Sequence, residues 1–163
     1  MKKALFLCLV FVLCTSRYLS AEAISLGITQ VEPIGVEKKT ARLVEELLQT
    51  EFSRLPLFRL VERGKLDSIL NEQQLQLSGI TSAESAVQAG NILNVQKVIF
   101  GPIGYYESDY IKYLLSLRLV DVEKASVEAA ESIQIRSGEE ILEAVAKIVE
   151  RISEKIELSG RVT

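Results

Sequence analysis

The chain has 163 residues, of which 48% are hydrophobic and 25% are charged, and its formal net charge is −3. This length and composition predict one ordinary globular domain and exclude a disordered or fibrous chain. An acidic chain without a basic stripe is poorly suited to neutralise phosphates, so we expect no nucleic-acid partner.

The first 23 residues have the pattern of a secretory signal peptide. Two lysines precede an apolar run over residues 4–13, and Ala21-Glu22-Ala23 offers a small-x-small cleavage site. The run is much shorter than the roughly 20 apolar residues that a membrane-spanning helix needs, so we expect no transmembrane segment in the mature chain. We expect an exported protein with a signal peptide over 1–23 and a single domain over 24–163.

Both cysteines, Cys8 and Cys14, lie inside the predicted signal peptide. The mature chain therefore has no thiol for a disulfide, for catalysis or for a metal site. Acylation of Cys14 would make the protein a lipoprotein, but Leu13 is bulky where a bacterial lipoprotein signal normally has a small residue. Lipid anchoring is the less favoured alternative. Without residues 1–23, which hold three basic side chains and one acidic side chain, the net charge is −5.

The mature chain begins with a strand, a helix and a second strand. Residues 24–29 are an apolar strand, and Pro33 and Gly35 predict a turn into a helix over 37–55, where apolar residues recur every three or four positions. Pro56 ends this helix, and residues 57–62 form the second strand. This order implies a parallel strand pair with a right-handed crossover.

Two short helices and a central strand come next. The first helix covers residues 63–73, and Thr81 with Glu84 forms a capping box that begins the second. The second helix has a face of small and apolar residues that would allow close approach to a sheet: Ala83, Ala86, Val87, Gly90 and Leu93. Residues 97–103 are apolar on both faces, which is typical of a central parallel strand.

The C-terminal part alternates apolar and polar residues over 110–122 and 127–136, which predicts an antiparallel hairpin with one wet face. Glu131 interrupts the apolar face, and we expect a bulge or a sheet edge there. Ser137 and Glu140 form a capping box for the last helix. Its buried stripe would be Ile141, Leu142, Val145, Ile148, Val149, Ile152 and Ile156, with Gly160 just past its end.

These elements predict an α/β fold in the order βαβααβββα. Its core would be a three-layer-like mixed sheet of about five strands, with a parallel N-terminal half, an antiparallel C-terminal hairpin and packed helices.

Residue types that carry catalysis are scarce. The sequence has no histidine, so a zinc-type site is excluded together with the commonest general base. The pairs Glu45-Glu46 and Glu139-Glu140 are sequence neighbours on helices, and we interpret them as solvated faces and not as acid/base dyads. Residues 101–104 follow a strand but lead into more strand, which predicts a bend and not a phosphate loop. We expect no enzyme activity, no cofactor and no metal.

Glu62 and Arg63 form one candidate site, at the carboxyl end of the second strand, where open α/β sheets bind ligands. A small ligand is one interpretation. The favoured alternative is that Arg63 holds the following helix through Glu62 or Glu72.

Four tyrosines form the other candidate site, a possible protein interface around the turn at 107–109: Tyr105, Tyr106, Tyr110 and Tyr113. Alternation places them on both faces of the hairpin, so they cannot all be core. Tyrosine is favoured at interfaces because it buries a large area and keeps a polar tip. Cross-strand packing within the hairpin is an equally good interpretation.

Three segments carry a family resemblance: FRLVERGKLDSILNEQQLQLSG, AGNILNVQKVIFGPI and LSLRLVDVEKASV. They resemble the periplasmic domain of the curli secretion channel family (CsgG-like), and the peptidoglycan-synthase activator lipoproteins (LpoB-like) share a similar domain. The resemblance spans nearly all of the mature chain. It implies an exported, periplasmic protein, with association with the outer membrane as an open alternative.

The sequence also departs from these relatives. Channel members insert membrane-spanning hairpins, whereas the connection at 107–109 and the next turn are both too short for strands of about 9 to 11 residues. The relatives are lipid-anchored, the activators carry a long tether, and Lys124-Ala125 lacks the glycine common at that turn of the family.

We therefore expect a non-enzymatic envelope module that works by protein contacts with secretion, flagellar or wall-synthesis machinery, or as a homo-oligomer. A peptidoglycan-synthase activator is the alternative, and a ligand-binding domain is less favoured.

Overall fold

The computed structural model describes residues 23–61, 82–106, 110 and 112–160. The predicted signal peptide, the helix over 63–73, Thr81 and the Glu62-Arg63 site lie outside these residues.

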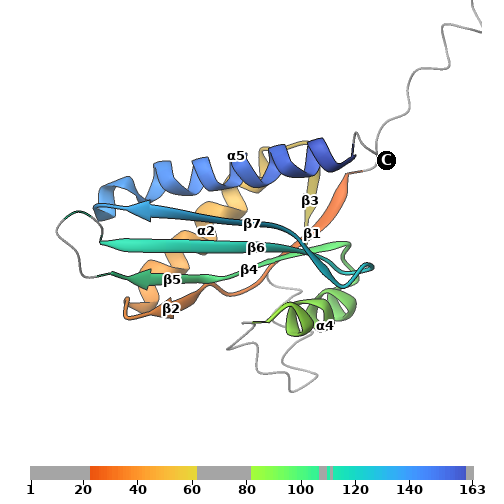
Figure 1. Ribbon diagram of the computed structural model, residues 1–163, viewed down its shortest axis with the longest axis horizontal. Coiled ribbons are helices and arrows are strands. Elements are labelled where there is room, and N and C mark those ends of the chain that lie inside the picture. The colour runs from red at the N-terminus through yellow and green to blue at the C-terminus, as the bar shows by residue number, and fades with distance from the viewer. Residues whose placement is uncertain (1–22, 62–81, 107–109, 111, 161–163) are drawn as a thin grey trace, which may run out of the picture.

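The described residues form one seven-stranded mixed sheet and three α-helices (Figure 1). The strands are β1 (Ile24–Ile28), β2 (Glu32–Ile34), β3 (Phe58–Leu60), β4 (Lys97–Phe100), β5 (Pro102–Tyr105), β6 (Tyr113–Asp121) and β7 (Ser126–Ile135). The helices are α2 (Lys38–Ser53), α4 (Ala83–Leu93) and α5 (Ile141–Gly160), with a 3-10 turn η2 (Gly138–Glu140) before α5. The predicted α/β class with a mixed sheet is confirmed. No helix in this part of the chain is long and apolar enough to span a membrane.

The sheet is parallel in its N-terminal half and antiparallel in its C-terminal half, as predicted. β1 lies between β3 and β4 and is parallel to both. β6 is the long central strand, because β4 and β5 pair with successive parts of one of its sides and β7 pairs along the other. β2 is parallel to β5. Within the described residues β7 pairs with β6 alone, so β7 is an edge strand.

Helices cover the two faces of the sheet unequally. α2 and α5 pack on one face over the main core, whose largest fully buried side chains include Phe52, Leu26, Leu48, Ile99 and Ile148. The smaller α4 covers one end of the other face, over Val98, Phe100, Val120 and Val122. In Figure 1 the second face is toward the viewer, and α2 lies behind the strands.

The predicted small-residue face of α4 brings this helix close to the sheet. A Cβ added to Gly90 would lie 2.3 Å from Val122 Cγ2 and 2.9 Å from Val98 Cγ2. The helix begins one residue later than expected, because Ser82 is its N-cap and Ser82 Oγ accepts from the Ser85 amide. The N-cap is therefore Ser82 instead of the predicted Thr81, whose own contacts lie outside the described residues.

The segment predicted as one strand over 97–103 is two strands with the expected bend between them. Gly101 lies between β4 and β5 with φ +152°, and a Cβ there would lie 2.0 Å from the Ser116 carbonyl oxygen. Only glycine fits this close approach. The turn expected at Pro33 and Gly35 is right for Gly35, where the chain bends with φ +66° before α2, and wrong for Pro33, which lies inside β2, opposite Ile103 of β5. β2 is a short outer strand, where a proline costs no ladder hydrogen bond if its nitrogen faces outward.

The C-terminal helix begins differently from the prediction. Ser137 makes no side-chain capping bond, and the Glu140 carboxylate accepts from the Arg136 amide at 3.1 Å. Leu142 is 57% exposed and does not belong to the buried stripe. Gly160 is still within α5.

The interruption at Glu131 is explained by a sheet edge, as one of the two alternatives expected. Glu131 lies on edge strand β7 and faces α5, where Lys155 Nζ lies 2.5 Å from its carboxylate and Arg151 lies 3.9 Å away. The β-bulge is three residues earlier, where Val120 pairs with Val127 and Leu119 pairs with Ala129, so that Glu128 is the extra residue.

Candidate functional site

The four tyrosines gather where β5 ends and β6 begins, and we call Tyr105, Tyr106, Tyr110 and Tyr113 the tyrosine tip. Tyr105 and Tyr113 are directly opposite each other in the sheet. Their rings meet edge to face, with centroids 6.2 Å apart and planes at 75°. This pair is the cross-strand packing that the sequence offered as one interpretation.

Most of the tyrosine tip remains open to solvent. Tyr105 is 48% exposed, Tyr106 is 57% exposed and Tyr110 is 81% exposed. Tyr113 is half-buried and packs against the main core. One tyrosine therefore anchors the group, and three keep the aromatic area that a partner could cover.

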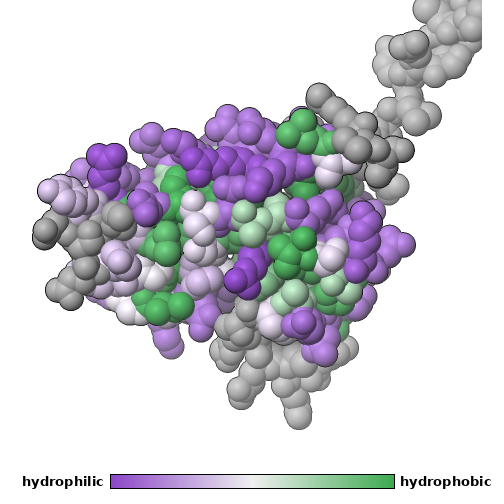
Figure 2. Space-filling view, in the orientation of Figure 1, coloured by the Kyte–Doolittle hydropathy of each residue, from purple (hydrophilic) through white to green (hydrophobic). Residues whose placement is uncertain are grey.

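Backbone hydrogen bonds hold the base of the tip. The Tyr106 amide donates to the Lys112 carbonyl at 3.0 Å, and the Lys112 amide donates to the Ile135 carbonyl at 2.9 Å. These bonds join β5, β6 and β7 at the same end of the sheet. Figure 2 shows the adjoining face, where apolar patches and hydrophilic residues alternate over the strands.

The second candidate site cannot be placed. Glu62 and Arg63 lie outside the described residues, which end at Val61 on this side. The Val61 amide donates to the Leu26 carbonyl at 3.1 Å, just past the pairing of β3 with β1. In the parts of the chain that are described, no group of three or more acidic residues could hold a metal ion.

A buried ionic cluster was missed by sequence reasoning. Lys97 begins β4 and is only 7% exposed, and its ammonium contacts the carboxylates of Asp121, at 3.1 Å, and Glu128. The bulge in β7 turns Glu128 toward this ammonium. The partners are 24 and 31 residues away in the chain, so no local pattern could show them.

The environment of Asp121 favours its charged form. Burial raises the pKa of this carboxyl, but the Lys124 amide, which donates at 2.9 Å, and the Lys97 ammonium outweigh burial and hold the pKa below its ordinary value. The Lys124 ammonium, 3.7 Å from the Asp121 carboxylate, balances the second negative charge, so the cluster is electrically compensated, which is typical of a structural ion pair.

Glu45 is the other buried charge. It is 3% exposed, and its carboxylate accepts from the Val31 amide at 2.8 Å, which ties the segment between β1 and β2 to α2. The interpretation of Glu45 as a solvated residue is wrong, whereas its neighbour Glu46 is exposed. The spacing along the helix could have shown that Glu45 is buried, because it lies four positions after Ala41 and three before Leu48, both on the buried face.

Comparisons with solved structures give the same fold at low identity. The chain is similar to the LpoB C-terminal domain from Salmonella enterica, with a TM-score of 0.57 and 14% identity over 79% of this chain and 93% of that one. It is similar to lipoprotein GNA1162 from Neisseria meningitidis, with a TM-score of 0.55 and 14% identity over 80% and 96%. It is also similar to the PelC dodecamer from Paraburkholderia phytofirmans, with a TM-score of 0.51 and 11% identity over 78% and 85%.

The family itself is established from the sequence. No curated protein matches the chain significantly. The profile of the family described as "Curli production assembly/transport component CsgG" matches residues 29–112, which run from the end of β1 to the start of β6 and make up more than half of the chain. The chain belongs to the CsgG family.

Proposed function

We propose that this protein is an exported, non-enzymatic module of the cell envelope that works by binding other proteins through the tyrosine tip. Membership of the CsgG family and the signal-peptide pattern over residues 1–23 support an envelope location. The absence of histidine from the whole sequence, and of cysteine after Cys14, supports a role without catalysis.

The observation that carries the proposal is the exposure of three tyrosines on an ordered base. Tyr105 is held against Tyr113, while Tyr106 and Tyr110 extend farther into solvent. Tyrosine is enriched among the residues that dominate binding energy, and a rigid aromatic group loses little entropy when a partner covers it.

A cross-linking capture in the native host tests this proposal. Tyr106→Ala combined with Tyr110→Ala leaves the Tyr105–Tyr113 pair in place, and we expect it to reduce partner capture about tenfold or more, as the loss of a dominant interface residue does. Leu142→Ala is the matched control, because Leu142 and Tyr106 are both 57% exposed. Thermal unfolding of each variant checks the fold. Capture that is unchanged in the double variant would remove the tyrosine tip from the account.

Self-association is one form that such contacts could take. The similar PelC structure is a dodecamer, which supports a test for a ring of identical subunits here. Light scattering on the purified protein over a wide concentration range measures the mass directly. A monomer at every concentration would exclude a homo-oligomer and leave a different protein as the partner.

A peptidoglycan-synthase activator is the second candidate. The chain covers 93% of the LpoB C-terminal domain, so nearly all of that folded unit has a counterpart here. The purified protein would then accelerate glycan polymerisation by the synthases of its own host. No acceleration with any of those synthases would eliminate this candidate.

A further inference from the structure

The free edge of β7 is the feature from which we draw a further inference. In an antiparallel strand, successive residues direct their backbone groups to opposite sides. The Ile135 carbonyl faces β6, because it accepts from the Lys112 amide. The backbone groups of Gln134, Ser132 and Ala130 therefore face away from β6, toward the open edge.

Among the described residues, side chains of η2 and α5 form hydrogen bonds to this edge at two places. Lys155 Nζ of α5 donates to the Ala130 carbonyl at 3.4 Å, and the Glu140 carboxylate accepts from the Arg136 amide at 3.1 Å. Both contacts agree with the direction deduced for the even-numbered residues. Between them, Ser132 and Gln134 have edge-facing amides and carbonyls with no hydrogen bond to another described residue. An unpaired strand edge of this kind accepts an additional strand.

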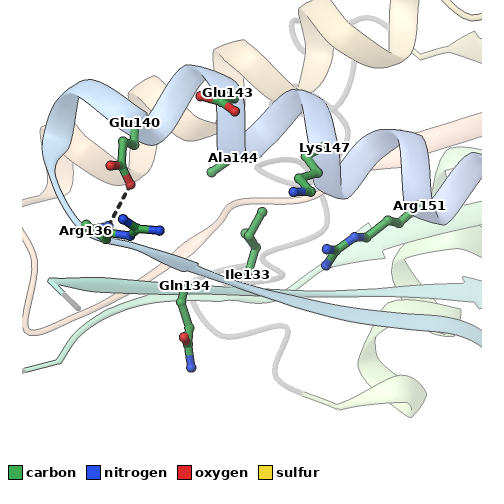
Figure 3. Close-up of a pocket in the computed structure, with 8 residues that line it drawn as sticks. All are labelled: Ile133, Gln134, Arg136, Glu140, Glu143, Ala144, Lys147 and Arg151. Carbon is green, nitrogen blue, oxygen red and sulfur yellow. Dashed lines mark hydrogen bonds between the residues drawn. The ribbon is translucent and has the colours of Figure 1, made fainter. Parts of the chain in front are cut away.

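A groove of about 290 Å³ lies beside this open stretch, between β7 and α5 (Figure 3). Lys147 and Arg151 point from the helix toward the strand, Ile133 points toward the helix, and Gln134 points away from it. Arg136 lines the strand end of the groove.

More basic than acidic side chains line the groove. Arg136, Lys147 and Arg151 are basic, Glu140 and Glu143 are acidic, and Glu143 lies higher on the helix, away from the strand. Lys147 is exposed and has no ion pair with any described residue. This basic groove is a local exception on a chain whose net charge is −3.

We propose that β7 takes up an extended, acidic segment of a partner protein as an additional strand at Ser132 and Gln134. Backbone hydrogen bonds would give the affinity, and side chains at alternate positions of the segment would point into the groove. Carboxylates at those positions would meet Lys147 and Arg136, and also Arg151, whose guanidinium already lies 3.9 Å from the Glu131 carboxylate. The inference rests on the proposed function, since it names a second surface for protein contacts and the class of segment that this surface binds.

Two variants separate the backbone contribution from the charge contribution. Gln134→Pro removes an edge-facing amide hydrogen without removing a bond to β6, and Gln134→Thr is the control that keeps the amide. Lys147→Glu reverses the charge of the groove. Lys39→Glu is its control, because Lys39 is an exposed lysine at the start of α2.

The experiment is a selection of displayed random twelve-residue peptides on the purified protein. We expect enrichment of peptides with carboxylates at alternate positions, and slower exchange of the Ser132 and Gln134 amide protons when a selected peptide is bound. Gln134→Pro and Lys147→Glu should each weaken this binding about tenfold, and the two controls should change it less than about twofold.

The inference is overturned if no acidic alternation is enriched, or if selected peptides bind Gln134→Pro as tightly as the unmodified protein. The tyrosine tip is intact in every one of these variants. A failure here therefore differs from a failure of the capture experiment with Tyr106→Ala and Tyr110→Ala.

Discussion

Replacing Gly90 by alanine is expected to weaken the fold through a single overlap. The new Cβ would lie 2.3 Å from Val122 Cγ2 and 2.9 Å from Val98 Cγ2, whereas carbon atoms pack best at about 3.5 to 4.0 Å. Overpacking of this kind costs about 1 to 3 kcal/mol, and the better helix propensity of alanine returns about 1 kcal/mol. Val98 lies on β4 and Val122 lies just past the end of β6, and both are buried. We therefore place the cost at its upper end and expect a net loss of about 2 kcal/mol.

Urea unfolding of Gly90→Ala, Val122→Ala and the double variant measures this overlap. Val122→Ala alone should cost about 2 kcal/mol, since Val122 is 8% exposed and its loss leaves a cavity. The double variant should be close to Val122→Ala alone, which corresponds to a coupling of about 1 to 2 kcal/mol. Gly138→Ala is the control, because a Cβ on Gly138 meets nothing within 4 Å. A Gly90→Ala protein as stable as the unmodified one, or an absence of coupling, would refute the close packing of α4.

Three further predictions concern single positions. Ala125 lies in the β6–β7 turn with φ +50°, a conformation that glycine adopts more easily than alanine. Ala125→Gly should therefore raise the free energy of unfolding by about 1 kcal/mol, and an unchanged urea midpoint would contradict this. The folded-state pKa of Asp121 is lowered, so the folded protein binds fewer protons than the unfolded chain as the pH falls through about 4, and the free energy of unfolding should fall in this range. Asp121→Asn should be less stable at pH 7, and its free energy of unfolding should change less between pH 7 and acid pH. Glu45→Ala removes the acceptor of the buried Val31 amide and should lower the free energy of unfolding in urea by about 1 to 3 kcal/mol. Glu45→Gln keeps an oxygen acceptor and should lower it less. Equal losses of stability in the two variants would show that this hydrogen bond is unimportant.

The elements that the sequence predicts well are those with a long periodic pattern. The stripe on α5 is buried at six of the seven expected positions, with Leu142 as the exception. The parallel pairing of β1 with β3 and the antiparallel pairing of β6 with β7 also follow from periodicity and chain order. Periodicity is informative here because one buried face fixes the register of the whole element.

Features that depend on distant partners were not predictable. β2 is three residues long and contains Pro33, so only its pairing with β5 identifies it as a strand. Lys97 is buried because the bulge in β7 supplies a second carboxylate, 31 residues later. The tyrosine tip was found from clustering in sequence, but the division between Tyr113 as anchor and Tyr106 as exposed surface required the structure.

Photocross-linking in living cells of the native host tests the central claim most directly. A photoreactive phenylalanine analogue is placed in turn at Tyr106 and Tyr110 in the tip and at Leu142 and Leu158 on α5, all of which are at least 57% exposed. Protein contact through the tip predicts a discrete cross-linked species from both tip positions and none from the two positions on α5. Cross-links that are absent at the tip, or equally strong on α5, would contradict it.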